Sequence, residues 1–415
     1  MSYSTVKGTR DIYGNEMVLW HQIEEAVRKT AHSFYFQEIR TPVIELTEVF
    51  KRAIGEETDI VSKEMFEFTD RGDRNITLRP EGTAGVVRAF SEHKLMNERN
   101  TRYYYIGPMF RAEKPQKGRQ RQFHQIGIEI FGDSSPYADY DVILFNLTLL
   151  EMLGLKNYKL KINSVGCKEC RPVYFQKLKD YLKPSYQELC ENCQKRFHTN
   201  TLRVLDCKSS GCKKITEKAP SIIKHLCPAC ETHFDELKTM LSASLVRYEI
   251  DPFIVRGLDY YTKTAFEIQL EGLGAQNAVC GGGRYDGLVG YFDPKNNIPG
   301  VGSAIGMERL VIALESQGQE TAEEKGLDYF VIAGSFEAKI KLLPLLKKIR
   351  NAEKSILLST SEKNFSKQFK EADKLGALNV LVFGEDEIKE GMISVKNMKS
   401  GEQKKLSLDE LTDSL

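Results

Sequence analysis

The chain has 415 residues, of which 41% are hydrophobic, so it is long enough for two or three domains with sizeable cores. No run of about 18 apolar residues occurs, so we expect no membrane-spanning helix and no membrane partner. The formal net charge is only +1, and binding to nucleic acid would therefore depend on local basic patches.

The N-terminal region predicts a helix followed by a strand. Its first residues, MSYSTVKGTRDIYG, have no apolar signal core, so we expect a cytoplasmic protein. Apolar residues from Trp20 to Phe34 recur at helical spacing. Residues 36–45 are predicted to form a strand. Because Pro42 cannot donate a hydrogen bond to a sheet ladder, it should lie at an edge or an interface.

The peptide RPEGT, residues 79–83, follows a predicted hairpin at 64–79 and precedes a helix. Thr83 is suited to the N-cap of that helix, and Gly82 allows another group to approach the backbone closely. Two interpretations of Glu81 are about equally good. It could bind an ammonium group of a ligand, or it could interact with the helix dipole.

Two further strands are predicted at 102–111 and 123–131, joined by a polar loop. Isoleucines occupy one face of the second strand, and this face should be buried. The opposite face is predicted to form the floor of a small-molecule pocket, because it carries an aromatic ring, an amide, a gap and a carboxylate: Phe123, Gln125, Gly127 and Glu129.

The loop between these strands is basic. A tight hairpin needs about two to five loop residues, so this longer loop is expected to have a function. Arginines beside an aromatic ring suit a nucleotide, because the ring stacks on the base and the guanidinium groups hold phosphates. An ordinary solvated loop is the alternative, and the polar strand face beside it argues against that. The charged residues are Arg111, Glu113, Lys114, Lys117, Arg119 and Arg121.

The peptide FRAEKPQKGRQRQFHQIGIEIFG closely resembles motif 2 of the class II aminoacyl-tRNA synthetases, in the form found in the histidyl-tRNA synthetase family. Residues 7–11, KGTRD, resemble the N-terminal signature of that family, and the first helix, strand and Pro42 resemble motif 1, the class II dimer interface. The resemblance implies that Glu129 contacts the imidazole of histidine. It also implies that the α-amino group of histidine is held by Glu81, Thr83 and Gln125.

A later peptide, VRGLDYYT at residues 255–262, resembles the one that distinguishes this family from other class II enzymes. The resemblance implies that Arg256 contacts the histidine carboxylate and the α-phosphate of ATP. It also implies that Tyr261, with Tyr260 beside it, meets the imidazole ring. A cation fixed at the α-phosphate stabilises the charge that builds there in the transition state.

Residues 299–310 resemble motif 3 of the same enzymes, in which glycines admit ATP and an arginine, here Arg309, reaches its terminal phosphates. The glycine-rich residues 279–286 that precede this motif predict only a tight bend. The implied catalytic residues are Arg111 and Arg256. The implied ATP site comprises Arg111, Glu113, Arg119, Phe123 and Arg309.

Eight of the nine cysteines lie between residues 167 and 230. In a reducing compartment such clustering favours metal binding over disulfides. Two CxxC pairs can supply four thiolates to a tetrahedral structural zinc. Cys207 and Cys212 could replace one pair, and thiols that merely pack, or a relic of a metal site, are the alternative. The first predicted set of Zn²⁺ ligands is Cys190, Cys193, Cys227 and Cys230.

The predicted fold class is α/β, with an α+β catalytic domain. The resemblance implies the class II antiparallel sheet with flanking helices, in two parts at 1–166 and 252–320. Between them lies a cysteine-rich insertion at 167–251, which we expect to be irregular and too polar for a good core of its own. After a hydrophilic linker at 315–325, strands and helices alternate, which predicts a parallel core. Residues 326–415 resemble the anticodon-binding domain of this subclass.

The resemblance implies a homodimeric enzyme that activates L-histidine with ATP and Mg²⁺ and transfers it to the 3′ end of tRNA(His). No protein nucleophile is implied, because catalysis would consist of positioning and charge stabilisation. The alternative is a synthetase-like regulatory subunit of ATP phosphoribosyltransferase, which binds histidine without charging tRNA. Such paralogues lack the anticodon domain and tend to lose residues such as Arg256, and this chain has both.

Overall fold

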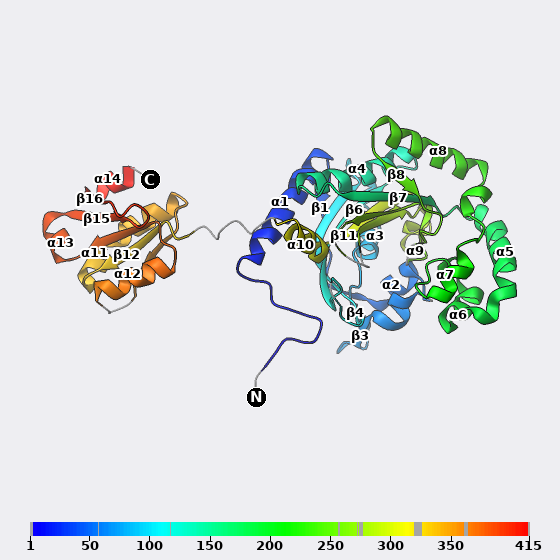
Figure 1. Cartoon of the computed structure of the whole chain (residues 1–415), viewed down its shortest axis with the longest axis horizontal. Helices are drawn as coiled ribbons and strands as arrows, with labels where there is room; N and C mark the ends of the chain where they lie inside the picture. Colours follow the sequence, from blue (N-terminus) through cyan, green and yellow to red (C-terminus); the bar gives the residue numbers. More distant parts are fainter. Residues whose placement is uncertain are drawn as a thin grey trace. The chain divides into compact units, whose positions relative to one another are not determined.

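The computed structural model describes residues 3–413 except 57, 117, 256–257, 272, 274–276, 319–325 and 361–363. The chain divides into two compact units, Met1–Glu320 and Thr321–Leu415 (Figure 1). Among the described residues, no helix combines the length and the apolar character that are needed to span a bilayer.

An eight-stranded sheet forms the centre of the first unit (Figure 1). Its strands are β1 (Gln37–Glu38), β5 (Arg102–Phe110), β6 (Gln122–Phe131), β7 (Tyr158–Ser164), β8 (Tyr248–Ile250), β9 (Thr262–Leu270), β10 (Ala278–Arg284) and β11 (Gly300–Gly306). The order in the sheet is β1-β5-β6-β11-β10-β9-β7-β8. In this spatial order, every pair of neighbouring strands between β5 and β7 is antiparallel. The edge strands β1 and β8 are parallel to their neighbours β5 and β7. The antiparallel sheet predicted for the catalytic region is therefore confirmed.

Helices cover both faces of this sheet. On one face the isoleucine side of β6 is buried, as predicted, against α1 (Glu16–Ser33), α4 (Pro136–Met152) and α10 (Met307–Ser316). Because side chains alternate along a strand, Phe123 belongs to the other face. That face packs against α2 (Thr47–Ile54), α3 (Thr83–Glu92) and α9 (Val289–Phe292).

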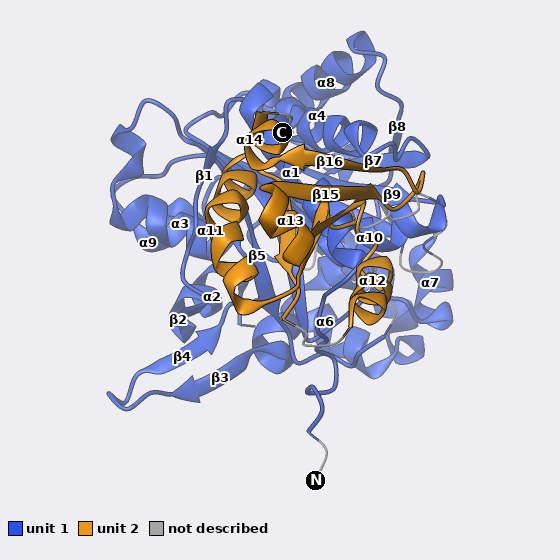
Figure 2. Cartoon of the chain, turned by 90° about the vertical axis from the view of Figure 1, so that its left-hand side faces the viewer, with its two compact units in different colours: residues 1–320 blue, residues 321–415 orange. Residues whose placement is uncertain are grey.

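A smaller sheet projects from the first unit (Figure 2). It contains β2 (Ile44–Leu46), β4 (Asn75–Leu78) and β3 (Phe66–Thr69), in that order, and the β3–β4 pair is the predicted hairpin. The single strand predicted at 36–45 is wrong, because β1 and β2 belong to different sheets. Pro42 is exposed between them, and its lack of an N–H group explains why the ladder is interrupted there.

The glycine-rich segment forms the central strand β10 rather than the predicted tight bend. It pairs with β9 on one side and β11 on the other. A Cβ atom at Gly282 would lie 2.5 Å from the carbonyl oxygen of Gly302 and 2.7 Å from the ring of Phe266. Glycine is therefore needed for close packing within the sheet, not for a turn.

The cysteine-rich segment between β7 and β8 is helical, not irregular as we expected (Figure 1). It also has a small core of its own, around Tyr174, Leu178 and Leu182, although its composition predicted none. The last of its helices packs on α4 and adds side chains to the main core. The helices are α5 (Cys170–Leu182), α6 (Glu191–Thr199), α7 (Ser210–Thr216) and α8 (Pro228–Ala243).

The second unit has a five-stranded sheet in the order β13-β12-β14-β15-β16. Its strands are β12 (Tyr329–Ala333), β13 (Ile356–Leu358), β14 (Asn379–Phe383), β15 (Met392–Asn397) and β16 (Gln403–Ser407). Its helices are α11 (Phe336–Asn351), α12 (Phe365–Lys374), α13 (Glu385–Glu390) and α14 (Leu408–Asp413). The first three strands in this order form the predicted parallel core, and β15 and β16 extend it as antiparallel strands.

Candidate active site

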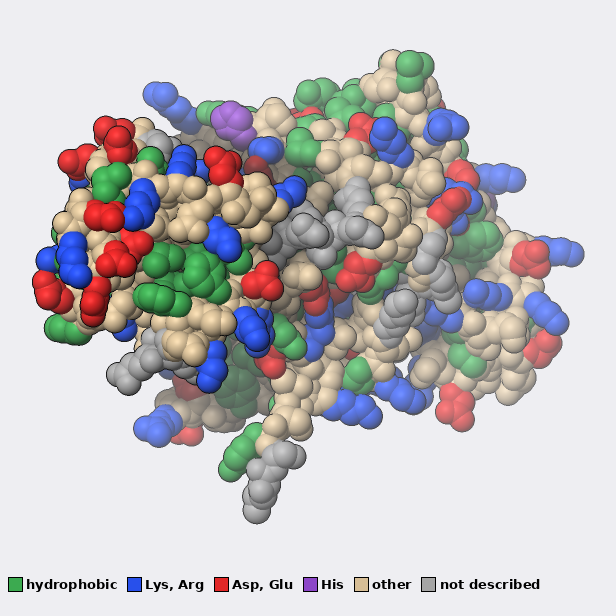
Figure 3. Space-filling model, turned by 60° about the vertical axis from the view of Figure 1, so that its left-hand side comes forward, with side chains coloured by type: hydrophobic (Ala, Val, Ile, Leu, Met, Phe, Trp, Pro, Cys, Tyr) green, Lys and Arg blue, Asp and Glu red, His purple; other side chains and the backbone are tan. Residues whose placement is uncertain are grey.

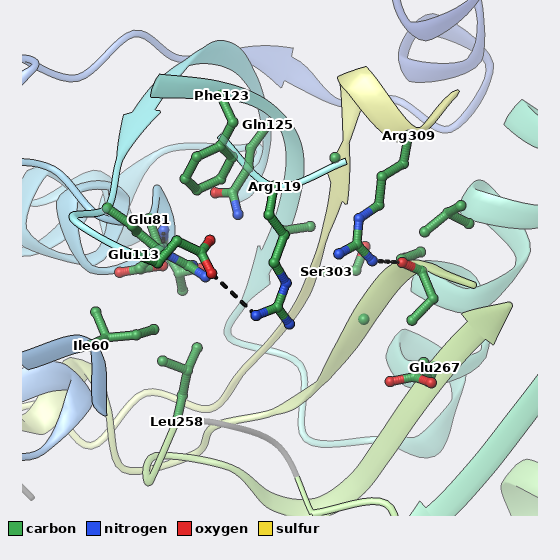
Figure 4. Close-up of a pocket in the computed structure, with 18 of the residues that line it drawn as sticks. Ile60, Glu81, Glu113, Arg119, Phe123, Gln125, Leu258, Glu267, Ser303 and Arg309 are labelled. Atoms are coloured by element: carbon green, nitrogen blue, oxygen red, sulfur yellow. Dashed lines mark hydrogen bonds and ion pairs between the residues drawn. The ribbon is translucent and has the colours of Figure 1, made fainter. Parts of the chain in front are cut away.

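A cavity of about 390 Å³ lies over the face of the central sheet that carries Phe123 (Figure 4). Predicted site residues from four separate stretches of sequence meet there, together with residues that were not predicted, although Arg256 and Lys117 lie outside the described residues. The predicted site residues that line the cavity are Glu81, Thr83, Arg111, Glu113, Arg119, Phe123, Gln125, Tyr260, Tyr261 and Arg309.

Two oxygen acceptors, on Glu81 and Gln125, face this cavity. Glu81 accepts hydrogen bonds from the N–H groups of Thr83 at 2.7 Å and Ala84 at 2.9 Å, which confirms its interaction with the helix terminus. The N-cap of α3 is Gly82, so the prediction that Thr83 caps the helix is wrong. Gln125 Oε1 is buried and accepts no hydrogen bond from the described residues. A buried, unpaired acceptor suits a ligand that brings its own donors.

Glu129 is fully buried and is not among the residues that line the cavity. The Thr83 hydroxyl donates to Glu129 Oε1 at 2.7 Å, and the Tyr285 hydroxyl donates to Oε2. Burial raises the pKa of Glu129 to about 8, while these hydroxyl donors oppose the shift. Tyr285 lines the cavity, but our sequence analysis gave it no role. Its position directly after β10, two residues beyond the last glycine of that strand, is the signal that could have identified it.

Arginines surround the part of the cavity beside the aromatic ring (Figure 4). The Cζ atom of Arg111 lies 5.1 Å from the centroid of the Phe123 ring. Arg119 forms an ion pair with Glu113 at 3.1 Å, and Arg309 donates to a backbone carbonyl of β10. Burial lowers the pKa of both Arg111 and Arg309 from the usual value. Cations held in a partly enclosed cavity suit a polyanionic ligand such as a nucleotide phosphate.

The acidic residues of the cavity suit a divalent cation that arrives with such a ligand. Glu113 and Glu267 line the cavity, and carboxylate oxygens are ligands that Mg²⁺ prefers. Among the described residues, the potential metal-binding groups of three or more side chains consist of cysteines elsewhere. A Mg²⁺ ion in the cavity would therefore take most of its ligands from phosphates and water, as is usual for nucleotide sites.

One distant segment of the chain packs on the basic loop, and another lines the cavity itself. The N–H of Arg121 donates to the carbonyl oxygen of Gly8 at 2.7 Å, so the N-terminal peptide packs on the basic loop. Arg203 and Asp206 line the cavity from the cysteine-rich segment. No sequence pattern identifies these two residues, because only the tertiary fold brings their segment to the cavity.

The structure does not bring the four predicted zinc ligands together. One group contains Cys167, Cys170, Cys227 and Cys230, and the other contains Cys190, Cys193, Cys207 and Cys212. The two CxxC pairs that we combined thus belong to different groups, and the prediction of one shared site is wrong. The reason is topological: the start of α5 meets the start of α8, and the start of α6 meets α7. The alternative with Cys207 and Cys212 matches the second group.

The chain is similar to histidyl-tRNA synthetases along nearly its whole length. The sequence model of the Histidyl-tRNA synthetase family matches residues 8–310, and that of an anticodon binding domain matches residues 328–415. A histidine–tRNA ligase of Natranaerobius thermophilus is 47% identical, over 96% of this chain and 94% of its own. One of Acetivibrio thermocellus is 46% identical, over 99% and 98%. The crystal structure of apo S. aureus histidyl-tRNA synthetase aligns with a TM-score of 0.83 and 35% identity, covering 100% of this chain and 99% of that one.

Proposed function

This chain belongs to the histidyl-tRNA synthetase family and is a histidine–tRNA ligase, and we propose how its cavity carries out the ligation. A carboxylate oxygen of L-histidine attacks the α-phosphorus of ATP. The bond from that phosphorus to the bridging oxygen of the β-phosphate breaks, and pyrophosphate leaves. The terminal ribose hydroxyl of tRNA(His) then attacks the carbonyl carbon of histidyl-adenylate, and AMP leaves.

The α-ammonium group of histidine binds between Glu81 and Gln125 in this proposal. The observation that most strongly supports this binding mode is the buried Oε1 of Gln125, which accepts no hydrogen bond from the described residues. Both side chains line the cavity, and an ammonium group has three donors and no acceptor. Thr83 links the two ends of the ligand site, because its N–H donates to Glu81 and its hydroxyl donates to Glu129.

The imidazole ring of histidine faces Tyr260, Tyr261 and Tyr285, which line the cavity, and the buried Glu129 acts on it through the hydroxyl of Tyr285. Glu129 is held from both sides by the hydroxyls of Thr83 and Tyr285, so its carboxyl group cannot rotate freely. An amino acid without the two ring nitrogens would leave buried polar groups unpaired. Rejection of such analogues is therefore expected to be strong.

ATP binds with its base on the ring of Phe123 and its phosphates among Arg111, Arg119 and Arg309. A Mg²⁺ ion, held by ATP and Glu113, would neutralise phosphate charge. We propose from the resemblance of residues 255–262 to the family peptide that Arg256 contacts the α-phosphate and the histidine carboxylate. Catalysis is then positioning plus electrostatic stabilisation, since no side chain acts as a nucleophile.

The tRNA contacts the second unit, in keeping with its match to an anticodon binding domain. Figure 3 shows Lys and Arg side chains interspersed with Asp and Glu over one face of the molecule, so contacts with tRNA depend on local groups of lysines. The alternative of a regulatory subunit is not favoured, because histidine–tRNA ligases match nearly the full length of this chain, anticodon-binding region included.

We also propose a cytoplasmic homodimer that associates through the region resembling motif 1. Large apolar side chains are exposed on the small sheet nearby: Ile44 is 51% exposed, Leu46 50% and Phe68 44%. A cluster of this kind is typical of a surface that binds another protein. Sedimentation velocity tests the proposal, since a monomer at micromolar concentration would contradict it.

One aminoacylation assay tests the main proposal. Purified protein, ATP, Mg²⁺ and histidine are incubated with total tRNA, and charged tRNA is measured with each of several amino acids in turn. Histidine alone is expected to be attached. Histidine binding without any charging would contradict the ligase and favour the regulatory subunit.

A further inference from the structure

The structure sorts eight cysteines into two groups, and we propose that each group binds one Zn²⁺ through four thiolates. The outer site consists of Cys167, Cys170, Cys227 and Cys230. The inner site consists of Cys190, Cys193, Cys207 and Cys212. Within each group all four sulfur atoms lie within 4.8 Å of one another.

The sulfur separations agree with tetrahedral zinc. Four thiolates about 2.3 Å from one Zn²⁺ place neighbouring sulfurs about 3.8 Å apart. The Sγ atom of Cys167 lies 3.7 Å from that of Cys170 and 3.8 Å from that of Cys227. In the inner site the Sγ atoms of Cys190 and Cys207 are 3.8 Å apart. All eight are free thiols, and a polynuclear iron–sulfur cluster would hold its thiolates farther apart, because they bind different metal atoms.

Backbone N–H groups also point at these sulfur atoms, as they do around bound metal ions. The N–H of Glu169 donates to Cys167 Sγ at 3.3 Å, and the N–H of Cys227 donates to Cys170 Sγ at 3.0 Å. In the inner site the N–H of Cys190 donates to Cys212 Sγ at 3.3 Å. Such donors favour the thiolate form that zinc requires and orient the ligands.

Each site contains a CxxC pair that begins a helix, because Cys190 is the N-cap residue of α6 and Cys227 is the N-cap residue of α8. The outer site has a second CxxC pair, Cys167 and Cys170, whereas Cys207 and Cys212 of the inner site have four residues between them. In the sequence the inner site lies entirely between Cys170 and Cys227 of the outer site, so the outer Zn²⁺ closes a loop that contains the inner one. Both ions would stabilise the fold by restricting an otherwise flexible segment.

The small core of this segment explains why metal is needed. Its buried residues include Cys193, Cys207 and Cys212 themselves, beside a few large apolar side chains such as Tyr174 and Leu178. A core of this size contributes little hydrophobic free energy, and small units of this kind are commonly stabilised by metals.

The outer site is directly connected to the histidine pocket. The side chain of Arg171 donates hydrogen bonds to the carbonyl oxygens of Val165 and Tyr261. The N–H of Lys263 donates to the carbonyl oxygen of Gly166 at 2.9 Å, next to Cys167. Lys263 has a φ of 49°, a conformation that is unfavourable for a lysine and that must be held by its surroundings. The outer Zn²⁺ would thus keep the peptide carrying Tyr261 in place.

The primary experiment measures metal in the purified full-length wild-type chain. Inductively coupled plasma mass spectrometry is expected to find two zinc per chain, and X-ray absorption at the zinc edge is expected to find four sulfur neighbours at about 2.3 Å. One zinc per chain, iron in place of zinc, or eight thiols that all titrate rapidly in the native protein would each overturn the proposal. No variant is needed for this test, so a folding defect cannot obscure it.

Variants then assign the ligands. Cys167→Ser/Cys227→Ser and Cys190→Ser/Cys193→Ser are each expected to lose one zinc and keep the other. The control, Cys280→Ala, removes the ninth cysteine and should keep both. If the mixed pair Cys190→Ser/Cys227→Ser lost only one zinc, the two separate sites would be disproved, because that pair has one ligand in each.

The effect on the pocket is tested separately and rests on the proposed function. Cys167→Ser/Cys227→Ser is expected to raise the KM for histidine at least tenfold, whereas the exposed Lys168→Ala should leave both KM and zinc content unchanged. An unchanged KM after loss of the outer zinc would disprove the positioning role alone. A wild-type chain that binds two zinc but does not activate histidine would disprove the function and not the sites.

Discussion

The cavity and the cysteine-rich segment are held in place by different physical means. The cavity is built on six antiparallel strands, with large cores on both faces of the sheet. The segment from α5 to α7 has only a small core, to which cysteines contribute. We therefore expect the cavity to keep its shape through backbone hydrogen bonding and packing, and the segment to depend on metal. Four predictions test this difference.

The largest effect is expected for Arg256→Ala, which should remove a cation needed mainly in the transition state. Histidine-dependent pyrophosphate exchange should fall about 10²–10³-fold, which corresponds to about 2.7–4 kcal/mol by analogy with loss of one oxyanion-hole donor. The thermal transition and both zinc ions should remain. Arg350→Ala, in the second unit, is the control and should exchange normally. Near-normal exchange by the Arg256 variant would remove this residue from the proposed mechanism.

A smaller effect is expected for Glu81→Gln, which loses the charge and keeps one of the two oxygens that accept the N–H groups of Thr83 and Ala84. Hydrogen bonds to charged groups contribute about 1.5–3 kcal/mol, so the KM for histidine should rise about 10- to 150-fold. The KM for ATP should change little. Glu98→Gln, an exposed and matched substitution, should have no effect on either constant. If both KM values rose together, Glu81 would act on the fold rather than on histidine.

The same type of substitution, glycine to alanine, should have opposite effects at Gly302 beside the cavity and at Gly211 in the cysteine-rich segment. A Cβ at Gly302 would lie 1.8 Å from Glu129 Oε2 and 2.5 Å from the carbonyl oxygen of Ile128. Overpacking of this kind destabilises by about 1–3 kcal/mol. At Gly211 of α7 the nearest atom would be Ser209 Oγ at 4.0 Å, so alanine should be neutral or stabilise the helix by about 0.5–1 kcal/mol. Urea unfolding measures both, and equal effects would refute the contrast in packing.

A fourth prediction concerns the pH dependence of stability. The pKa of Glu129 is raised to about 8 by burial, so the folded protein holds a proton that the unfolded chain has already lost above about pH 4.5. Stability contributed by this group is therefore fully present below pH 4.5 and is lost as the pH rises to about 8. The Glu129→Gln variant cannot lose that proton, so its melting temperature relative to wild type should increase from pH 5 to pH 8 and then level off. A constant difference would contradict the raised pKa.

The local sequence pattern predicted most helices and strands, because each of these elements has its own hydrophobic periodicity. The alternation of isoleucine along β6 identified the buried face, and the motif residues led to a set that the structure gathers around one cavity. Prediction from the sequence failed where the structural role of a residue depends on residues that are distant in the sequence but close in space. The glycines of β10 suggested a bend, but they are required by the carbonyl oxygen of Gly302 and the ring of Phe266 across the sheet.

The family, the order of the elements and the types of side chain in the cavity could be read from the sequence, because they follow from local spacing and motif identity. The tertiary structure was needed to show that Tyr285 donates to Glu129 and that Arg203 lines the cavity from the cysteine-rich segment. It also decided which cysteines are neighbours. CxxC pairs look alike in a sequence, and their partners are chosen by which helix starts pack together, a long-range property that local spacing does not encode.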